Sequence, residues 1–551
     1  MRTLRFTLFL IVAVAALTAQ NMRNIPEGNQ ISGPGRTSDG LSWMVELRQW
    51  TIQPEAQFET WLADLRAWRR ERLTRIGYTD EQYRRPELQW SQRNFIQPQM
   101  MAEDRYFYDP EARKYTVDRY LDDLDKRYGG IDSVLIWPVY PNIGIDNRNQ
   151  WDLHRDMPGG IPALRAMVKD FQRRGVRVFF PTMPWDNGTR DPGMPHWQAT
   201  AELMAEIGAD GVNGDTFDGV PRAYRTASDA TGHPVVFEPE AAPTGDEALI
   251  WNNQSWGYWK YAFAPTVSRQ KWLEPRHMVN VCNRWARDKT DDLQFAFFNG
   301  VGYESWENIW GIWNQITPRD AEALRRAARV ERFFADLLVS ADWEPHTVTR
   351  QFGIFASKFP LPGKTLWTVV NRNEYDVSGD QITVPHREGR RYYDVWQGVE
   401  LEPAMSQAKA TLSFPIEGHG FGAILALDPG TAIADLDKLL AQMREWSKTP
   451  LRSFSHEWRF LPQKMVEIAP TKPAPDAPAG MVRIPGGEFV FRVTGIEIEG
   501  YNWEGLDVQY AWESSPRRGH ERRMTMKPFY IDRYPVTHAD FKKFIDATSY
   551  H

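Results

Sequence analysis

Short apolar runs alternate with amphipathic segments from about residue 94 to residue 339. The runs are rich in Val, Ile and Phe, which favour strands, and the segments between them repeat apolar residues at helical spacing. The predicted strands are 94–100, 131–137, 176–181, 210–215, 235–237, 277–282, 295–298 and 335–339, and the clearest helices are 117–128, 162–174 and 197–207. These units predict an α/β fold, a (β/α)₈ barrel over residues 44–345. A doubly wound sheet is the alternative, but no GxGxxG follows the first predicted strand.

The pattern changes after the barrel. Residues 346–428 hold β-branched and aromatic runs separated by turns, and they predict an all-β sandwich. Residues 429–479 then contain an amphipathic helix, up to about residue 448, and a Pro-rich linker of polyproline II type. Small β-sandwiches of this kind resemble those that follow many glycosidase barrels, where their role is structural.

The N-terminus has the pattern of an export signal. Arg2 and Arg5 precede an apolar run over residues 6–17, and small residues near Ala15 and Ala19 offer cleavage sites. We predict a signal peptide at 1–20 and a polar tether at 21–43. The apolar run is short for a membrane span, so we expect a secreted or periplasmic protein without stable membrane association once the signal is removed.

Composition narrows the class of partner. The chain of 551 residues has a net charge of −6 and no basic run, which argues against a nucleic-acid partner. It contains 24 Trp, and aromatic faces stack on sugar rings, so a carbohydrate substrate is expected; a large aromatic core is the alternative reading. The single cysteine, Cys282, excludes an internal disulfide. We expect neither a metal site nor a cofactor.

Carboxylates and aromatic residues follow the predicted strands, where a barrel holds its chemistry. Taken in strand order, they are Glu103, Asp104, Tyr140, Asp146, Trp185, Asp186, Asp215, Asp218, Glu238, Glu240, Asn283, Arg284, Trp285, Asp288, Glu304, Trp306 and Glu307. Hydrolysis of a glycosidic bond needs two carboxyl groups and aromatic walls that hold the ring. From this set we expect Trp185, Asp186, Glu240, Arg284, Trp285 and Trp306 to bind substrate.

Asp215 is the sharpest catalytic candidate. It ends a glycine-rich segment, 208–215, whose backbone can approach a ligand closely. The segment resembles the fourth strand of retaining α-glycosidases of the α-galactosidase type, and that resemblance implies a nucleophile at Asp215. The alternative is a structural Asp that binds the next loop. For the partner acid, the α-galactosidase pattern favours Asp288 and a β-glycosidase pattern favours Glu304, with Glu240 third.

The C-terminal segment carries a different motif. Residues 481–491 read MVRIPGGEFVF, and residues 526–544 read MKPFYIDRYPVTHADFKKF. This resembles the opening of a formylglycine-generating enzyme (sulfatase-modifying factor) domain, here truncated and assigned to 480–551. The resemblance implies copper–thiolate oxygenase chemistry that uses cysteines further along such a domain, and Cys282 lies outside the segment. We expect the chain to be a fragment of a longer protein.

Three functions remain open from the sequence. The first is an exported glycoside hydrolase-like protein with an appended sulfatase-modifying-factor module. The second is a formylglycine-generating or related oxygenase whose catalytic part lies beyond residue 551. The third is a non-catalytic carbohydrate-binding protein on the same barrel.

Overall fold

The computed structural model describes residues 28–34 and 55–548, apart from residues 103, 105, 143–145, 242, 244, 284–287, 308–314, 459–468, 495–509, 511, 515–516 and 518. The expected signal peptide, Glu103, Arg284 and Trp285 therefore lie outside the described residues. Within that part of the chain, no helix is long and apolar enough to cross a membrane.

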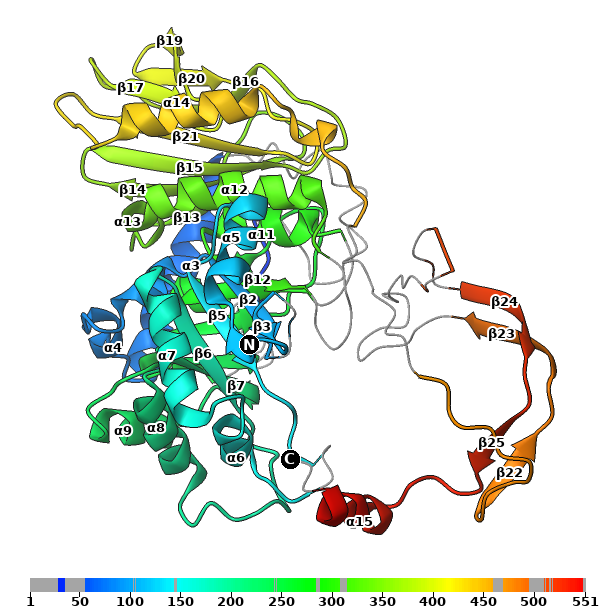
Figure 1. Ribbon diagram of the computed structural model, residues 1–551. Helices are drawn as coiled ribbons and strands as arrows, with labels where there is room; N and C mark the ends of the chain where they lie inside the picture. The colour runs from blue at the N-terminus through cyan, green and yellow to red at the C-terminus, as the bar shows by residue number, and fades with distance from the viewer. Residues whose placement is uncertain are drawn as a thin grey trace, which may run out of the picture.

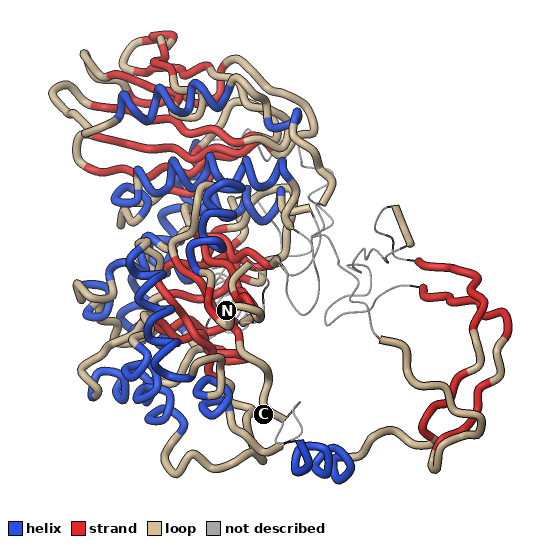
Figure 2. Tube along the Cα trace, viewed as in Figure 1, coloured by secondary structure: helices blue, strands red, loops and turns tan. Residues whose placement is uncertain are grey.

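Eight parallel strands form the central sheet (Figures 1 and 2). In sheet order they are β8 (Val236–Ala241), β7 (Gly211–Asp218), β6 (Arg177–Thr182), β5 (Ser133–Trp137), β2 (Ile96–Met101), β12 (Gly302–Trp306), β11 (Met278–Cys282) and β9 (Gln254–Gly257). The two outermost strands, β8 and β9, lie against each other. The N–H of Asn253, just before β9, donates to the carbonyl of Phe237 in β8 at 3.2 Å. The sheet therefore closes into the predicted barrel.

Helices cover the outside of the barrel, as Figure 2 shows. They are α5 (Val117–Tyr128), α6 (Gln150–Arg155), α7 (Gly160–Arg173), α8 (His196–Ile207), α9 (Arg222–Ala230), α10 (Arg269–Leu273), α11 (Thr290–Asn299), α12 (Pro318–Phe333) and α13 (Ala335–Leu338), with α3 (Glu55–Arg75) and α4 (Glu81–Arg84) before the first strand. Short strand pairs add to this frame: β1 (Gln30–Ile31) with β10 (Val267–Ser268), and β3 (Tyr108–Asp109) with β4 (Lys114–Tyr115).

Two of the predicted strands were wrong. Residues 295–298 lie in α11 and residues 335–338 form α13, while the true sixth and eighth strands are β9 and β12. Helix α11 packs against β11 and β12 on one side and against β14 and β15 of the next domain on the other. The helix is therefore buried nearly all round. A short apolar run such as residues 295–298 does not distinguish a buried helix from a buried strand.

A two-sheet β-sandwich follows the barrel, as predicted. The larger antiparallel sheet contains β13 (Glu344–Thr347), β14 (Ile354–Leu361), β15 (Lys364–Asn371), β21 (Phe421–Leu427), β17 (Arg391–Asp394) and β18 (Val399–Leu401), and the smaller one contains β16 (Asp380–Pro385), β20 (Lys409–Ser413) and β19 (Ala404–Ser406). Trp367, Ile382 and Leu412 pack between the sheets. The opposite face of the larger sheet packs on α11 and on α14 (Leu436–Ser447) through Phe421 and Leu439.

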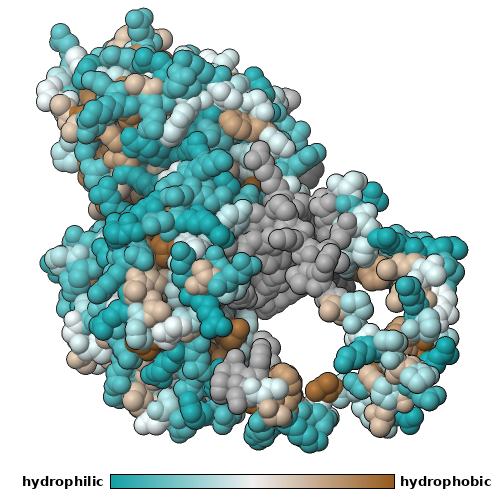
Figure 3. All heavy atoms as spheres, in the orientation of Figure 1, coloured by the Kyte–Doolittle hydropathy of each residue, from teal (hydrophilic) through white to brown (hydrophobic). Residues whose placement is uncertain are grey.

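The C-terminal segment forms two antiparallel strand pairs, which stand apart from the barrel in Figure 1, and a helix. The pairs are β22 (Met481–Ile484) with β25 (Phe529–Asp532) and β23 (Gly487–Thr494) with β24 (Gly519–Met526), followed by α15 (His538–Thr548). No residue of α15 is buried, and Phe489 and Ile531 are each about half exposed. Figure 3 shows hydrophobic patches on this part of the surface.

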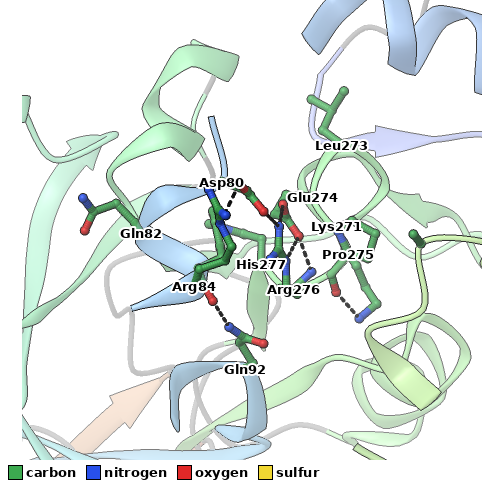
Figure 4. Close-up of polar contacts among 12 residues, drawn as sticks. Asp80, Gln82, Arg84, Gln92, Lys271, Leu273, Glu274, Pro275, Arg276 and His277 are labelled. Atoms are coloured by element: carbon green, nitrogen blue, oxygen red, sulfur yellow. Dashed lines mark hydrogen bonds and ion pairs between the residues drawn. The ribbon is translucent and has the colours of Figure 1, made fainter. Parts of the chain in front are cut away.

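An ion-pair network lies where β11 begins, at the N-terminal end of the barrel (Figure 4). Arg276 binds Glu274 at 2.7 Å and Asp80 at 3.1 Å. The buried ring of His277 lies between the hydroxyls of Tyr83, at 2.8 Å, and Ser255, at 3.0 Å. Burial lowers the pKa of His277 to about 3, so the ring is neutral. This end of a barrel supplies stability, and the chemistry is sought at the other end.

Candidate functional site

Asp215 lies near the C-terminal end of β7, where the strand departs from regular pairing. The register with β8 shifts between Gly214 and Asp218, and Thr216 adopts a left-handed conformation with φ of 59°. Such a bulge redirects the side chains around it. Asp215 is 8% exposed, and its Oδ2 accepts a hydrogen bond of 2.9 Å from the indole N–H of Trp185. The expected strand-end position of Asp215 agrees with the structure.

Glu240 is the carboxylate on the neighbouring strand. Gly214 of β7 is the register partner of Pro239 in β8, so Asp215 and Glu240 follow paired residues. Oε2 of Glu240 accepts from the N–H of Thr216 at 2.7 Å, which ties this side chain to the residue after Asp215. Adjacent strands are about 4.8 Å apart, and the two acids therefore belong to one site at the mouth of the barrel.

Tyr258 holds the other oxygen of Glu240. It follows β9, is 41% exposed, and its hydroxyl donates to Oε1 of Glu240 at 2.8 Å. This contact was not predicted, because β9 was not recognised from the sequence. Strand β9 reads Gln-Ser-Trp-Gly and lacks the β-branched residues that mark a strand.

Aromatic rings form a wall beside Asp215. Trp185 and Tyr140 are both half-buried, with ring centroids 5.6 Å apart and planes inclined by 36°. Tyr140 also contacts Trp137, a buried residue of β5, at 5.6 Å. Half-exposed rings next to carboxylates offer a stacking surface for a flat apolar face such as that of a sugar ring.

Below this mouth, the barrel interior is polar. Seven fully buried side chains make up what we call the lumen belt: Gln97, Gln99, Asn213, Glu238, Gln254, Asn280 and Glu304. Asn213 and Glu238 are register partners, as are Gln97 and Glu304, so each pair shares a face of the sheet. The amide of Asn280 donates to the amide oxygen of Gln97 at 2.9 Å. Barrel interiors are commonly filled by branched apolar residues, so this belt is unusual.

Burial favours the neutral forms of the two glutamates of the belt. It raises the pKa of Glu238 to about 8, and nearby amide and indole donors oppose this rise only in part. Neither of its oxygens makes a hydrogen bond of regular geometry within the described residues. Burial, and then the charge of Glu238, raise the pKa of Glu304 well above its usual range. At neutral pH the Glu238 side chain is therefore mostly protonated.

The structure buries the predicted residues Glu304 and Trp306. Glu304 is not exposed at all and lies within β12, the eighth strand, so it does not face Asp215 across an open cleft as we expected. Trp306 is buried in the lumen against Trp256, with centroids 6.0 Å apart.

Two of the predicted aspartates have structural contacts. Asp186 is buried and accepts from the N–H of Gln150, the first residue of α6, at 2.9 Å. Asp288 accepts from the N–H of Thr290 at 2.7 Å, where α11 begins. Burial acts to raise the pKa of Asp288, but the hydrogen bonds from Thr290 and the charge of Arg319 outweigh burial and lower it. Both contacts stabilise helix starts.

We also searched the described residues for side chains that could bind a metal ion. In the part of the chain that the structure describes, no group of three or more His, Cys, Asp or Glu side chains is placed to hold a metal ion.

Comparison with known proteins identifies the C-terminal segment. Residues 467–551 match the family model described as the sulfatase-modifying factor enzyme 1-like domain, which confirms the resemblance of that segment. No curated protein matches the chain.

Solved structures similar to the chain include α-amylases and a β-L-arabinopyranosidase. An Anoxybacillus α-amylase is 11% identical, with a TM-score of 0.44, over 62% of this chain and 99% of its own. A β-L-arabinopyranosidase of family GH27 from Geobacillus stearothermophilus is 12% identical, with a TM-score of 0.40, over 63% and 99%. An α-amylase from Geobacillus thermoleovorans, complexed with acarbose, is 10% identical, with a TM-score of 0.43, over 62% and 99%. These likenesses carry no conclusion about chemistry.

Proposed function

We propose that the chain is an exported glycoside hydrolase in which Asp215 is the nucleophile and Glu240 the general acid and base. The observation that carries this proposal is the position of two carboxylates after register partners on neighbouring strands, with Glu240 bound at 2.7 Å to the N–H of Thr216, the residue after Asp215. Because adjacent strands are about 4.8 Å apart, we infer a separation close to the roughly 5 Å between carboxyl groups that retaining enzymes use. We therefore assign retention of configuration.

The proposed reaction has two displacements. In the first, Asp215 bonds to the anomeric carbon while the bond to the leaving oxygen breaks, and that oxygen takes a proton from Glu240. In the second, water gives a proton to Glu240 and its oxygen bonds to the anomeric carbon, which releases Asp215 as a carboxylate. Each step returns the two acids to the state that the next step needs.

Binding of the sugar is assigned to the aromatic wall. Tyr140 and Trp185 present half-buried rings beside Asp215, and the indole N–H of Trp185 keeps the carboxylate oriented. The substrate class is accordingly a carbohydrate with an accessible glycosidic bond. Export to the periplasm or the outside is inferred from the apolar N-terminal run alone.

Glu304 and Asp288, our first choices for the acid, are replaced by Glu240 in this proposal. A general acid must reach the leaving oxygen within hydrogen-bond distance, directly or through one water. Glu304 is fully buried in the lumen belt, and Asp288 is committed to the start of α11. The sulfatase-modifying-factor segment contains no cysteine, so the part present here offers no thiolate for the oxygenase alternative.

The experiment is a hydrolysis assay of the full chain against a broad panel of aryl glycosides and oligosaccharides. Asp215→Asn should lose nearly all activity on every substrate. Glu240→Gln should lose activity on oligosaccharides but keep much of it on aryl glycosides whose leaving group needs no proton. Asp218→Asn, at an exposed position of the same strand, is the matched control and should stay active. No hydrolysis by the unaltered protein, or full activity of Asp215→Asn, would refute the proposal.

A further inference from the structure

The two carboxyl oxygens of Glu240 accept hydrogen bonds from two different donors, a backbone N–H and a phenol hydroxyl. Oε2 faces the backbone N–H of Thr216 at 2.7 Å, and Oε1 faces the hydroxyl of Tyr258 at 2.8 Å. The first donor comes from the bulge in β7 and the second from the segment after β9, so Glu240 is held between the two neighbours of its own strand end.

The two donors differ in whether they can also accept a hydrogen bond from a protonated carboxyl group. A backbone N–H can only donate, and an unprotonated carboxyl oxygen accepts that hydrogen bond more strongly than a protonated one, so the proton is favoured on the other oxygen. A phenol can donate to a carboxylate or accept from a carboxylic acid by rotating its own hydrogen. Oε2 of Glu240 is thus fixed as an acceptor, while Oε1 can alternate between the two states.

Thr216, which donates to Glu240, has a strained backbone conformation. A β-branched residue with φ of 59° is an outlier, and such strain persists where the surroundings impose it. The strained turn directs the N–H of Thr216 towards Glu240 rather than along the β7 ladder.

We propose that Thr216 and Tyr258 are positioning residues which place the exchangeable proton of Glu240 on Oε1. This inference rests on the proposed function and adds the atom from which the proton leaves. During the first displacement, Oε1 gives its proton to the leaving oxygen, and the Tyr258 hydroxyl then turns to donate to the new carboxylate. During the second, water returns a proton to Oε1 and Tyr258 again accepts.

The test is the pH dependence of kcat/KM for Tyr258→Phe. Without the phenol, the carboxylate form of Glu240 loses a donor, so the alkaline limb should move to higher pH by about one unit. The loss of kcat should be larger for poor leaving groups than for activated aryl glycosides, because only poor leaving groups need the proton. Tyr258 is 41% exposed, so the substitution should not disturb folding.

One variant serves as the control. Tyr375→Phe removes a phenol that is 60% exposed in the sandwich domain and should leave the profile unchanged.

The inference is overturned if Tyr258→Phe hydrolyses its substrates with an unchanged alkaline limb and an unchanged dependence on the leaving group. A shift in Tyr375→Phe as large as that in Tyr258→Phe would also contradict the role given to Tyr258. These results differ from failure of the proposed function, in which the unaltered protein hydrolyses nothing on the panel.

Discussion

The indole N–H of Trp185 donates to Oδ2 of Asp215 across 2.9 Å, from the loop after β6 to the end of β7. This bond joins the aromatic wall to the proposed nucleophile, so one side chain both orients the carboxylate and offers a face to the sugar. A donor to an ionised group contributes more than a neutral hydrogen bond, roughly 1.5–3 kcal/mol. The orientation of Asp215 therefore depends on a residue of the loop after β6.

Trp185→Phe should keep the ring face and remove the donor. We expect kcat/KM to fall by about 10–100-fold, and the acid limb of the pH profile to move to higher pH because the carboxylate form is less stabilised. Steady-state kinetics across pH would measure both effects. Trp197→Phe, at a residue 43% exposed on α8, is the matched control. Unchanged kinetics in Trp185→Phe would show that the indole N–H of Trp185 does not support the function of Asp215.

Tyr140→Ala should weaken substrate binding more than catalysis. The ring lies beside Trp185 at a centroid distance of 5.6 Å and offers a face to the sugar, so its loss removes stacking energy of about 1 kcal/mol. KM should rise severalfold while kcat stays within about twofold of its original value. A kcat loss comparable to that of Asp215→Asn would instead place Tyr140 in the chemistry.

Glu238→Gln should stabilise the protein at alkaline pH. Burial raises the folded-state pKa of Glu238 from 4.5 to about 8, so between these values the folded chain holds a proton that the unfolded chain has released. Stability contributed by this group therefore falls as pH rises through that window, by about 1.4 kcal/mol for each unit. The variant removes this dependence, and its advantage should be largest near pH 8.

Urea unfolding of both proteins from pH 5 to pH 8 measures this difference. Glu388→Gln, at an exposed turn of the sandwich domain, is the control and should show the wild-type pH dependence. A Glu238→Gln protein whose stability declines with pH as steeply as the wild type would show that Glu238 is not buried in its neutral form.

Limited proteolysis should cut the chain between residues 469 and 480 and then degrade the C-terminal segment. Phe489, Ile531 and Tyr534 are 51%, 49% and 74% exposed, so the strand pairs bury little apolar surface among the described residues. Little burial leaves little stability against local opening. Mass spectrometry of the fragments would follow the order of cleavage. A C-terminal fragment that persists as long as the barrel would contradict this expectation.

Strands with a β-branched, apolar sequence could be predicted. Strands whose side chains form the polar lumen belt, such as β12, could not. β5 and β6 were recognised because their residues are apolar on both faces, as in parallel sheets covered by helices. β12 reads Gly-Tyr-Glu-Ser-Trp because Glu304 points into the lumen belt, and this sequence has no strand pattern. Tertiary packing, and not local propensity, therefore determines that residues 302–306 form strand β12 and that residues 290–299 form helix α11.

The position of one candidate residue along its strand was predictable from the sequence. Glycines before Asp215 mark a strand end, and the structure places Asp215 near the C-terminal end of β7, where its side chain is 8% exposed. The partner acid was not predictable, because Glu240, Glu304 and Asp288 all follow apolar runs in the sequence. Only strand register and burial distinguish a carboxylate beside Asp215 from one inside the barrel or one at a helix start.

The measurement that tests the central claim most directly is trapping of the glycosyl-enzyme. The protein would be incubated with a fluorinated glycoside inactivator of the sugar identified by the panel, digested, and its labelled peptide sequenced by mass spectrometry. The account predicts one covalent adduct on Asp215, absent from Asp215→Asn, together with products of retained configuration. An adduct on Glu240, Glu238 or Glu304, or hydrolysis with inverted configuration and no adduct, would contradict it.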